Sequence, residues 1–560
     1  MLAYSLVALV LSYIGWTLIC LEANVRKARR LGVPVQRLPV DVHNLLWIII
    51  QPHIWKVLDR LPIPWASYPT CIRYARRGWY VPAKAEAHVR MGPVWALVTP
   101  VMIDVHVADP DAILDMVTRR GDFQRPHANF KLLELYGPCI SSASWEEWPR
   151  HRKPVATPFN ESLMKPVWDE SLRQAKGMLA SWTEKSEGGS CGIPSYQADT
   201  RMLSLNVLAA IGFGSHYDFR GSDEPAAVGD EVGNYRDSLM TVLDNIILLM
   251  LVPFHVLTKL PGRYARIGNA GIAFKRHLVK LLDDETAALN EGRPSSGAIM
   301  PSFARAAERY HREHPSGDGK TAAKARGLSA EEIFGNLFVI NFAGHDSTAN
   351  TSAFAVLLLA AHPDIQAWVA EEVGHATKGY AAGAIEDWDY KTLYPRPQAL
   401  PRRPVRNFAS VPAGTGLAVR DAPPPAIAAR RRPDADRADR MHPDYWPDAD
   451  EWRPSRWITN PEGARSMSEE ELITPGKTVF IPWGEGPQAC PGKKVAEVEE
   501  VAVLACLLKS HRLATKKKYD GETDEAVYKR FEKCVNDIDL EMLVKLRDGD
   551  QIALNCTEAS

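Results

Sequence analysis

The chain has 560 residues, of which 46% are hydrophobic and 24% charged, and its formal net charge is −1. These values are typical of globular proteins, and the length suits one large domain or two or three ordinary ones. A balanced charge gives no general field for nucleic acid, so we expect no nucleic-acid partner. The eight cysteines include no Cys-x-x-Cys pair. This argues against a zinc site and a disulfide framework, and it favours a reducing compartment.

The chain begins with an apolar segment. Residues 2–21 are almost entirely apolar, and the basic residues that follow them are Arg26, Lys27, Arg29 and Arg30. About 20 apolar residues in a helix span a hydrocarbon core, and the charges behind them place the rest of the chain in the cytosol. A cleaved signal peptide is the competing interpretation, but no Lys or Arg precedes the segment and no clear cleavage site follows it. We predict a single-pass anchor at residues 1–22.

A basic hinge and membrane-proximal segment is predicted at residues 23–60. Its apolar run, Leu45–Val57, is too short to span a bilayer. It either dips into the membrane interface or packs on the domain that follows, predicted at residues 61–560.

Local patterns predict the elements of the first half. Two β-branched runs, Val94–Val98 and Val101–Val107, indicate a hairpin. Asp109 and Pro110 open a short helix that ends near Thr118. Helical periodicity dominates from Glu161 to Leu289, and the polar stretch Gly292–Gly327 is predicted to be a loosely ordered connection.

A long helix is predicted from the capping box Ser329–Glu332 to Ala361, where Pro363 stops it. Its middle contains Ala343-Gly344-His345-Asp346-Ser347-Thr348. Small residues leave a gap where a flat cofactor can lie, and a carboxylate next to a hydroxyl can relay protons. The alternative is an ordinary helix whose Ser and Thr hydroxyls bond to backbone carbonyls.

A cysteine lies in a glycine- and proline-rich loop near the C-terminus. The stretch from Thr478 to Val495 contains Gly484, Gly486 and Gly492 around Cys490 and leads into a helix-forming segment. Positive potential at a helix N-terminus and nearby amides lower the pKa of a thiol and stabilise its thiolate. A thiolate in such a rigid loop can be an axial haem ligand. Further on, strands around Leu540–Leu546 and Gln551–Leu554 are predicted to pair through a turn at residues 548–550.

Three motifs resemble those of cytochrome P450 monooxygenases, especially fungal membrane-bound ones. Trp483-x-x-Gly486-x-Gln488-x-Cys490-x-Gly492 resembles the cysteine-loop signature, with Trp483 for the usual Phe and Gln488 for the usual Arg. The Ala343–Thr348 stretch resembles the oxygen-activation motif, with Ser347 for the usual Thr. Trp148-Pro-Arg-His-Arg152 resembles the helical W-x-x-x-R motif, whose Trp and Arg share one helical face and reach a haem propionate.

The resemblance implies a mainly α fold with a small β region and b-type haem held between the long helix and the cysteine loop. It implies Cys490 as the metal ligand and catalytic roles for Asp346, Ser347 and Thr348. The cofactor-binding residues that it implies are Trp148, Arg152, Ala343, Gly344, Trp483, Gly486, Gln488 and Gly492. The expected reaction is hydroxylation or epoxidation of a lipophilic small molecule, in secondary metabolism, at the endoplasmic reticulum membrane. Electrons would come from NADPH through the membrane-bound cytochrome P450 reductase.

One segment does not fit the family. Residues 396–440 hold 10 Arg, 8 Pro and 10 Ala and show no apolar periodicity. The family has a Glu-x-x-Arg helix here, and we predict that this spacing is missing between Ser347 and the cysteine loop. The family pattern returns at Met441–Trp446 and Trp452–Trp457, so Arg456 of the Pro-x-Arg motif is predicted to be buried without its carboxylate partner.

Two explanations for this segment remain open. Out-of-frame translation gives aperiodic sequence rich in Arg, Pro and Ala, and the composition favours it over a degenerate but genuine family member. A basic linker for an anionic partner fits poorly with so many prolines. The segment makes a haem-free, membrane-anchored remnant one alternative function. A thiolate-haem isomerase is a second alternative, which keeps the haem. The acid–hydroxyl pair argues against the isomerase, because rearrangement needs no proton relay.

Overall fold

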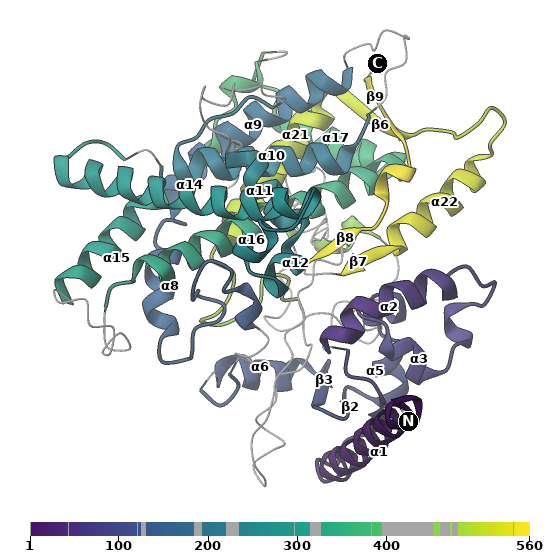
Figure 1. Cartoon of the computed structure of the whole chain (residues 1–560). Helices are drawn as coiled ribbons and strands as arrows, with labels where there is room; N and C mark the ends of the chain where they lie inside the picture. The colour runs from purple at the N-terminus through teal and green to yellow at the C-terminus, as the bar shows by residue number, and fades with distance from the viewer. Residues whose placement is uncertain are drawn as a thin grey trace.

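The computed structural model describes residues 2–42, 44–119, 121–124, 130–183, 193–219, 235–295, 297–313, 326–381, 384–394, 452–459, 471–472, 480–540 and 543–559. Within them the chain is mainly helical with small sheets, which confirms the predicted fold class (Figure 1). The anomalous segment 396–440 and Met441–Trp446 lie outside the described residues.

A small N-terminal part surrounds a three-stranded sheet of order β1-β2-β3. The predicted hairpin is confirmed, because β2 and β3 pair antiparallel with Val94 opposite Val107. The predicted helix after Asp109 is confirmed as α6, whose first turn is capped by the Asp109 carboxylate. The elements of this part are α1 (Leu2–Arg29), β1 (Val35–Arg37), α2 (Leu45–Leu58), α3 (Thr70–Ala75), α4 (Tyr80–Ala83), α5 (Glu86–Met91), β2 (Val94–Val98), β3 (Ile103–Val107) and α6 (Pro110–Thr118).

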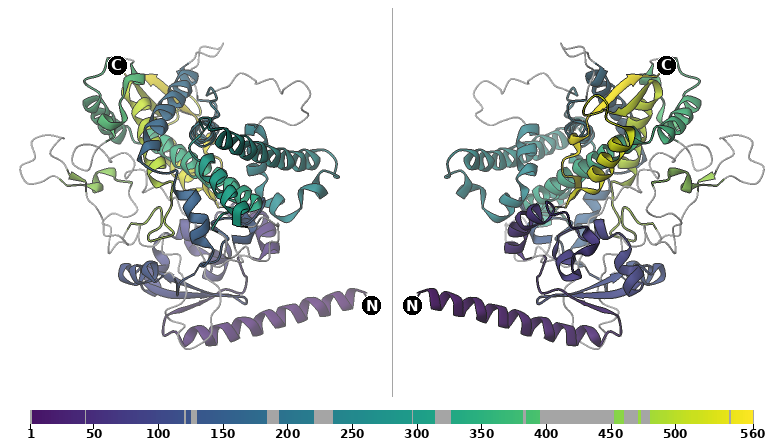
Figure 2. Two further views of the ribbon diagram at one scale, coloured as in Figure 1. Left: turned by 90° about the vertical axis from the view of Figure 1, so that its left-hand side faces the viewer. Right: turned by 90° about the vertical axis from the view of Figure 1, so that its right-hand side faces the viewer.

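Helix α1 projects from the body along most of its length (Figure 2). Its segment Val7–Arg29 is long and apolar enough to cross a membrane, and an apolar window of 18 residues within it is only 6% buried. The last turns are different, since Leu21, Val25 and Ala28 pack on the sheet and Asn24 donates to the carbonyls of Thr99 and Pro100. The helix passes without a break through residue 22, where the anchor was predicted to give way to a hinge.

The helical body is organised around α16 (Ala330–Ala361), the long helix predicted from the capping box. Ser329 Oγ accepts from the Glu332 amide, and the Glu332 carboxylate accepts from the Ser329 amide. Helices α9, α10 and α21 pack with α16 around one apolar core. The other elements of this body are α8 (Trp148–Ala156), α9 (Glu161–Thr183), α10 (Tyr196–Phe213), α11 (Tyr235–Asp244), α12 (Ile246–Leu251), α13 (Phe254–Leu257), α14 (Arg263–Glu291), α15 (Met300–Glu313), α17 (Pro363–Ala376), α18 (Tyr390–Leu393) and α21 (Lys493–Ser510).

Two predictions about elements are wrong. The stretch Gly292–Gly327 is not a loose connection throughout, because α15 occupies Met300–Glu313 and buries Met300, Phe303, Ala304 and Ala307 at helical spacing. The C-terminal strands also pair differently. Strand β7 (Ile538–Leu540) pairs with β8 (Val544–Leu546), and β6 (His511–Thr515) pairs with β9 (Leu554–Glu558). Helix α22 (Asp524–Asn536) lies between these strands in the sequence, and β4 (Ile458–Thr459) pairs with β5 (Glu471–Leu472).

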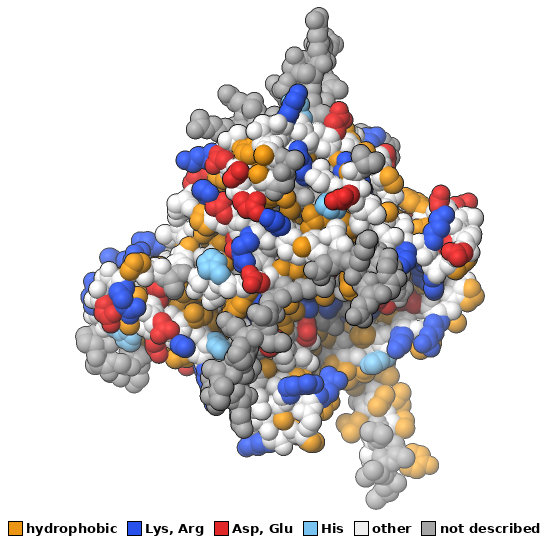
Figure 3. Space-filling view, turned by 90° about the horizontal axis from the view of Figure 1, so that it is seen from above, with side chains coloured by type: hydrophobic (Ala, Val, Ile, Leu, Met, Phe, Trp, Pro, Cys, Tyr) orange, Lys and Arg blue, Asp and Glu red, His pale blue; other side chains and the backbone are white. Residues whose placement is uncertain are grey.

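The surface agrees with the balanced composition. On the face seen from above, basic and acidic side chains are mixed and no single sign covers a large area (Figure 3). Such a face gives no extended field of one sign.

Candidate functional site

The cysteine loop is a tight turn closed by its own backbone. The Cys490 amide donates to the Trp483 carbonyl at 2.8 Å, and the Ala489 amide donates to Gly486 O at 3.0 Å. Gly484 and Gly486 have φ of 68° and 78°, the left-handed region that glycine adopts without strain. The turn ends at Gly492, the N-cap of α21, so Cys490 lies at a helix N-terminus as predicted.

The Cys490 side chain is exposed, yet protein surrounds the sulfur closely enough to change its chemistry. Burial raises the pKa of the thiol, although the Gly492 and Lys493 amides and the Arg152 guanidinium oppose this. The predicted effect of the helix end is present, but the predicted net lowering of the pKa is wrong because desolvation outweighs it. The Cys490 thiol is therefore harder to ionise than a free one, and a nearby cation such as a coordinated metal ion would favour the thiolate.

The other predicted residues of the loop lie around this sulfur. Lys493 Nζ stands 5.1 Å from the centre of the Trp483 ring, and Gln488 is half-buried. A Cβ added at Gly492 would meet Cys490 Sγ at 3.9 Å, an ordinary contact. Contacts within the protein therefore do not explain why position 492 is glycine.

Helix α8 places its two predicted residues together and near the cysteine. Trp148 is buried, and the Arg152 guanidinium lies 5.8 Å from the centre of its ring. Burial lowers the pKa of Arg152, and the charge of Cys490 acts against that lowering. Arg152 and Cys490, 338 positions apart in the chain, are thus close enough for their charges to interact. Binding of both residues to one cofactor would require such proximity.

Helix α16 has an exposed stripe in its otherwise buried middle. Ala343, Gly344 and Ser347 are exposed, whereas the turns on either side of them are buried. Ser347 Oγ donates to the Ala343 carbonyl at 2.7 Å, which leaves its lone pairs available. Three of the predicted residues therefore share one accessible face of the helix.

The remaining residues of the motif lie off this stripe. Asp346 is on the flank, where Arg201 of α10 donates from Nε to its carboxylate at 3.0 Å. Arg201 also binds Asp244 of α11 at 2.9 Å. Thr348 is buried and donates to the Gly344 carbonyl at 3.3 Å. His345 is fully buried and bonds to the Asn341 carbonyl, and its burial lowers its pKa.

Sequence reasoning missed several polar residues near the site. Arg201 is one, because nothing in the sequence links it to Asp346, 145 positions away. Glu499 and Glu500 of α21 are two more, both buried at the centre of the helical body, where Ser352 of α16 hydrogen-bonds to Glu500. A signal for this pair was visible, since two adjacent acids interrupt an apolar helix.

The prediction that Arg456 is a buried arginine without a partner is wrong. Arg456 is half-buried and has an interaction partner, so it is not a buried arginine left alone. Its segment packs well, with the buried Trp457 ring 4.6 Å from Phe480 at the start of the cysteine loop. Trp452 lies 5.3 Å from the His362 ring. The prediction that Glu-x-x-Arg is missing before the cysteine loop is also wrong, because Glu462 and Arg465 have this spacing, after Arg456 and outside the described residues.

Comparison with known proteins identifies the family. The model of the cytochrome P450 family matches residues 76–387 and 440–528, and the chain belongs to this family. The interval between the two matched parts contains nearly all of the anomalous segment 396–440.

Fungal P450s are among the similar sequences. A cytochrome P450 monooxygenase of Arthrobotrys oligospora is 26% identical over 531 residues, covering 88% of each chain. The phomenoic acid biosynthesis cluster cytochrome P450 monooxygenase of Leptosphaeria maculans is 26% identical over 547 residues, covering 89% of each. Among solved structures, the cytochrome P450DA heme domain has a TM-score of 0.61 at 18% identity, covering 88% of this chain and 96% of that one. The structural likeness supports the fold.

Proposed function

We propose that this protein is a haem-thiolate monooxygenase that hydroxylates or epoxidises a lipophilic small molecule. The observation that carries the proposal is the exposed Cys490 sulfur, which amides of a helix N-terminus contact and on which the charge of Arg152 acts. The chain's residues fit b-type haem, because a thiolate donor, a paired Trp and Arg, and the exposed stripe on α16 are all present. When bound, the haem activates dioxygen and transfers one of its oxygen atoms.

The protein's own groups then have separate tasks. Cys490 would supply the thiolate that holds the haem iron, and the loop glycines would let the backbone lie close to the cofactor. Trp148 and Arg152 hold a propionate, a task that falls more heavily on them because Gln488 cannot form an ion pair. Ala343 and Gly344 leave room for substrate. Asp346 and Ser347 move protons, and Arg201 positions the Asp346 carboxylate by donating to it from Nε.

The setting of the reaction is also a proposal. The projecting apolar helix α1 supports a single-pass anchor in the endoplasmic reticulum membrane, with the catalytic domain in the cytosol and NADPH–cytochrome P450 reductase as electron donor. Exposed apolar residues on α2 suit contact with the same membrane. Lys494 is paired with Glu161, and Lys493 lies over Trp483 and is exposed. Secondary metabolism is supported by the biosynthetic cluster of the Leptosphaeria relative.

The test is spectroscopic. Membranes from cells expressing the full chain are reduced and treated with carbon monoxide, and a thiolate-haem difference band is expected. NADPH-dependent substrate oxidation with added reductase then separates a monooxygenase from a thiolate-haem isomerase. Absence of bound haem in a folded chain would contradict the proposal and support the remnant, which the family mismatch around residues 396–440 motivates.

Asp346→Asn is expected to slow oxidation by about 10²-fold, because a positioned acid–base group contributes at least that much. The thiolate-haem band should persist, since Asp346 binds Arg201 and not the cysteine loop. Turnover and haem content measured on one preparation test this. Ser347→Thr, which keeps the hydroxyl, is the matched control and should stay near wild-type rate. An unchanged rate in Asp346→Asn would remove Asp346 from the relay.

A further inference from the structure

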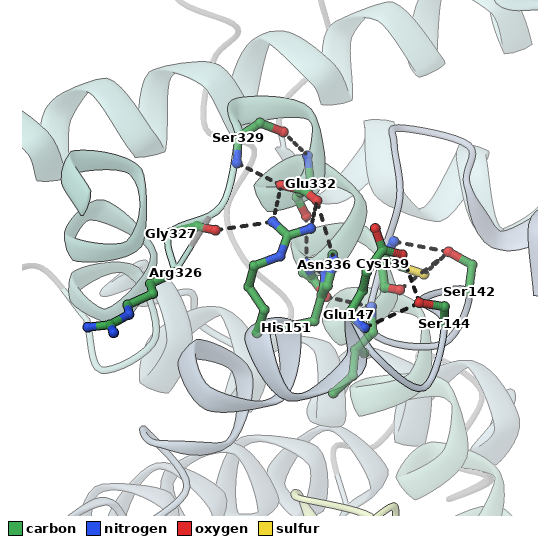
Figure 4. A network of polar contacts seen from close by, with 12 residues as sticks. Cys139, Ser142, Ser144, Glu147, His151, Arg326, Gly327, Ser329, Glu332 and Asn336 are labelled. Carbon is green, nitrogen blue, oxygen red and sulfur yellow. Dashed lines mark hydrogen bonds and ion pairs between the residues drawn. The ribbon is translucent and has the colours of Figure 1, made fainter. Parts of the chain in front are cut away.

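A buried polar cluster joins α8 to the first turns of α16 (Figure 4). Arg150 Nη1 and Nη2 donate to the two oxygens of Glu332 at 2.8 and 2.5 Å, and Nη1 also donates to the Gly327 carbonyl at 3.1 Å. Both side chains are about nine-tenths buried, at 8% and 10% exposure. A forked pair of this kind fixes orientation as well as distance.

His151 and Asn336 extend the contact. The Asn336 Oδ1 accepts from the Ile140 amide at 2.8 Å, which turns its Nδ2 toward His151 Nδ1 at 2.9 Å. An amide N–H₂ only donates, so Nδ1 accepts and the proton of the neutral ring is on Nε2. His151 Nε2 lies 3.5 Å from Glu332 Oε1. Burial raises the pKa of Glu332, but hydrogen bonds from His151 and Arg150 outweigh it and hold the pKa well below its usual value.

The turn before α8 is pressed on the same part of α16. A Cβ added at Gly335 would meet the Gly137 carbonyl oxygen at 2.2 Å, and one added at Gly137 would meet the Glu331 carbonyl oxygen at the same distance. Real Cβ atoms do not tolerate such distances, so both positions require glycine. The turn at Gly137 and the first turns of α16 are therefore in backbone contact, which restricts their movement relative to one another.

Helix α8 has few internal hydrogen bonds to fix its orientation. It has only nine residues and contains Pro149 and Pro154. Pro154 lacks the amide that would bond to the Arg150 carbonyl one turn earlier. At about 100° per residue, Arg150 lies on the face opposite Trp148 and Arg152. One face of α8 is thus bound to α16, and the other faces Cys490.

We propose that Arg150, His151, Glu332 and Asn336 form a positioning clamp that sets the roll of α8 and so aims Trp148 and Arg152 at the haem. The inference rests on the proposed function, because it assigns the clamp a role in retaining the cofactor. The contacts given above join these residues to α8, α16 and the segment around Ile140, and not to the described part of the cysteine loop, so they are positioning residues. Their loss should therefore weaken haem retention more than it weakens the fold.

The test compares Arg150→Met and Arg150→Lys with Arg73→Met in the full chain. Arg73 is a matched control, because it is equally buried and binds both oxygens of Glu86, but on α3 and α5, away from α8. Haem release to excess apomyoglobin and the melting temperature of the haem-free chain are measured for each. Arg150→Met is expected to release haem about ten- to a hundredfold faster, the usual effect of losing a group that orients a cofactor's contacts. Arg150→Lys, which keeps the charge but not the fork, should be intermediate.

The outcomes separate the two proposals. Faster release in Arg150→Met than in Arg73→Met, at a similar fall in melting temperature, supports the clamp. Equal release in the two variants overturns it and leaves a purely structural ion pair. If Arg150→Met does not fold, the comparison is made with Arg150→Lys and Glu332→Gln, and wild-type release in both overturns the clamp. A folded wild-type chain that takes up no haem overturns the proposed function, and the clamp's role in haem retention with it.

Discussion

Cys490→Ala is expected to abolish the thiolate-haem band and reduce substrate oxidation to the background of the haem-free chain. The reason is that Cys490 is exposed in the glycine-rich loop that ends at the N-terminus of α21, and alanine offers the iron no ligand. The haem-free fold should change by no more than about 0.5 kcal/mol, because an exposed side chain is being truncated. The carbon-monoxide difference spectrum, product yield and haem-free melting temperature of one preparation provide the measurement.

Cys506→Ala is the matched control for this substitution. Cys506 lies on α21, the same helix that Cys490 precedes, but it is buried in the apolar core. Its truncation should destabilise the fold by on the order of 1 kcal/mol and leave the band intact. A thiolate-haem band in Cys490→Ala would show that another sulfur binds the iron, and the site described above would be wrong.

The second large effect concerns the two buried glutamates of α21. Burial raises the pKa of Glu499 to about 8, and the neighbouring Glu500 adds to this rise. Burial likewise raises the pKa of Glu500 to about 8, against the hydrogen bond with Ser352. Both folded-state values exceed the value near 4.5 of an unfolded glutamate. Their contribution to the free energy of unfolding is therefore complete below about pH 4.5 and is lost as the pH rises to about 8.

Glu500→Gln should remove much of this pH dependence. Glutamine keeps the size and a hydrogen-bonding partner for Ser352 but cannot ionise. At pH 8 the variant is expected to be more stable than the wild type by on the order of 4 kcal/mol, and at pH 5 the difference should be small. Denaturant unfolding of the full haem-free chain in detergent at several pH values measures this.

Glu497→Gln, a half-buried position on the same helix, is the control for the glutamate experiment. It should follow the wild-type pH profile. A Glu500→Gln profile parallel to the wild type would mean that Glu500 is charged, and solvated or paired, inside the folded chain.

Local sequence signals predicted the elements that depend on neighbours in the chain. The capping box at Ser329 marked the start of α16, and Asp109 with Pro110 marked the start of α6. Helix α15 also had a local signal, because Met300, Phe303, Ala304 and Ala307 follow helical spacing, but the polar composition around it concealed the pattern. The pairing of β6 with β9 had no such signal, since α22 and a second strand pair separate them.

The site was predictable only where a motif spans a few residues. Cys490, Gly486 and the stripe of Ala343, Gly344 and Ser347 came from short patterns, and all five residues are exposed in the structure. The ion pairs that hold the elements in place were not predictable. Arg201 and Asp346 are 145 positions apart, and Arg150 and Glu332 are 182 apart. No periodicity or spacing connects such partners, because only tertiary packing brings them together.

The unbroken course of α1 has a mechanical consequence. A helix that is apolar at one end and bound through Asn24 and Val25 to the β1–β3 sheet at the other is a stiff arm without a joint. In a bilayer the tilt of this helix would therefore set the orientation of the attached domain. The catalytic domain would keep a fixed angle to the membrane surface and would not rotate freely above it.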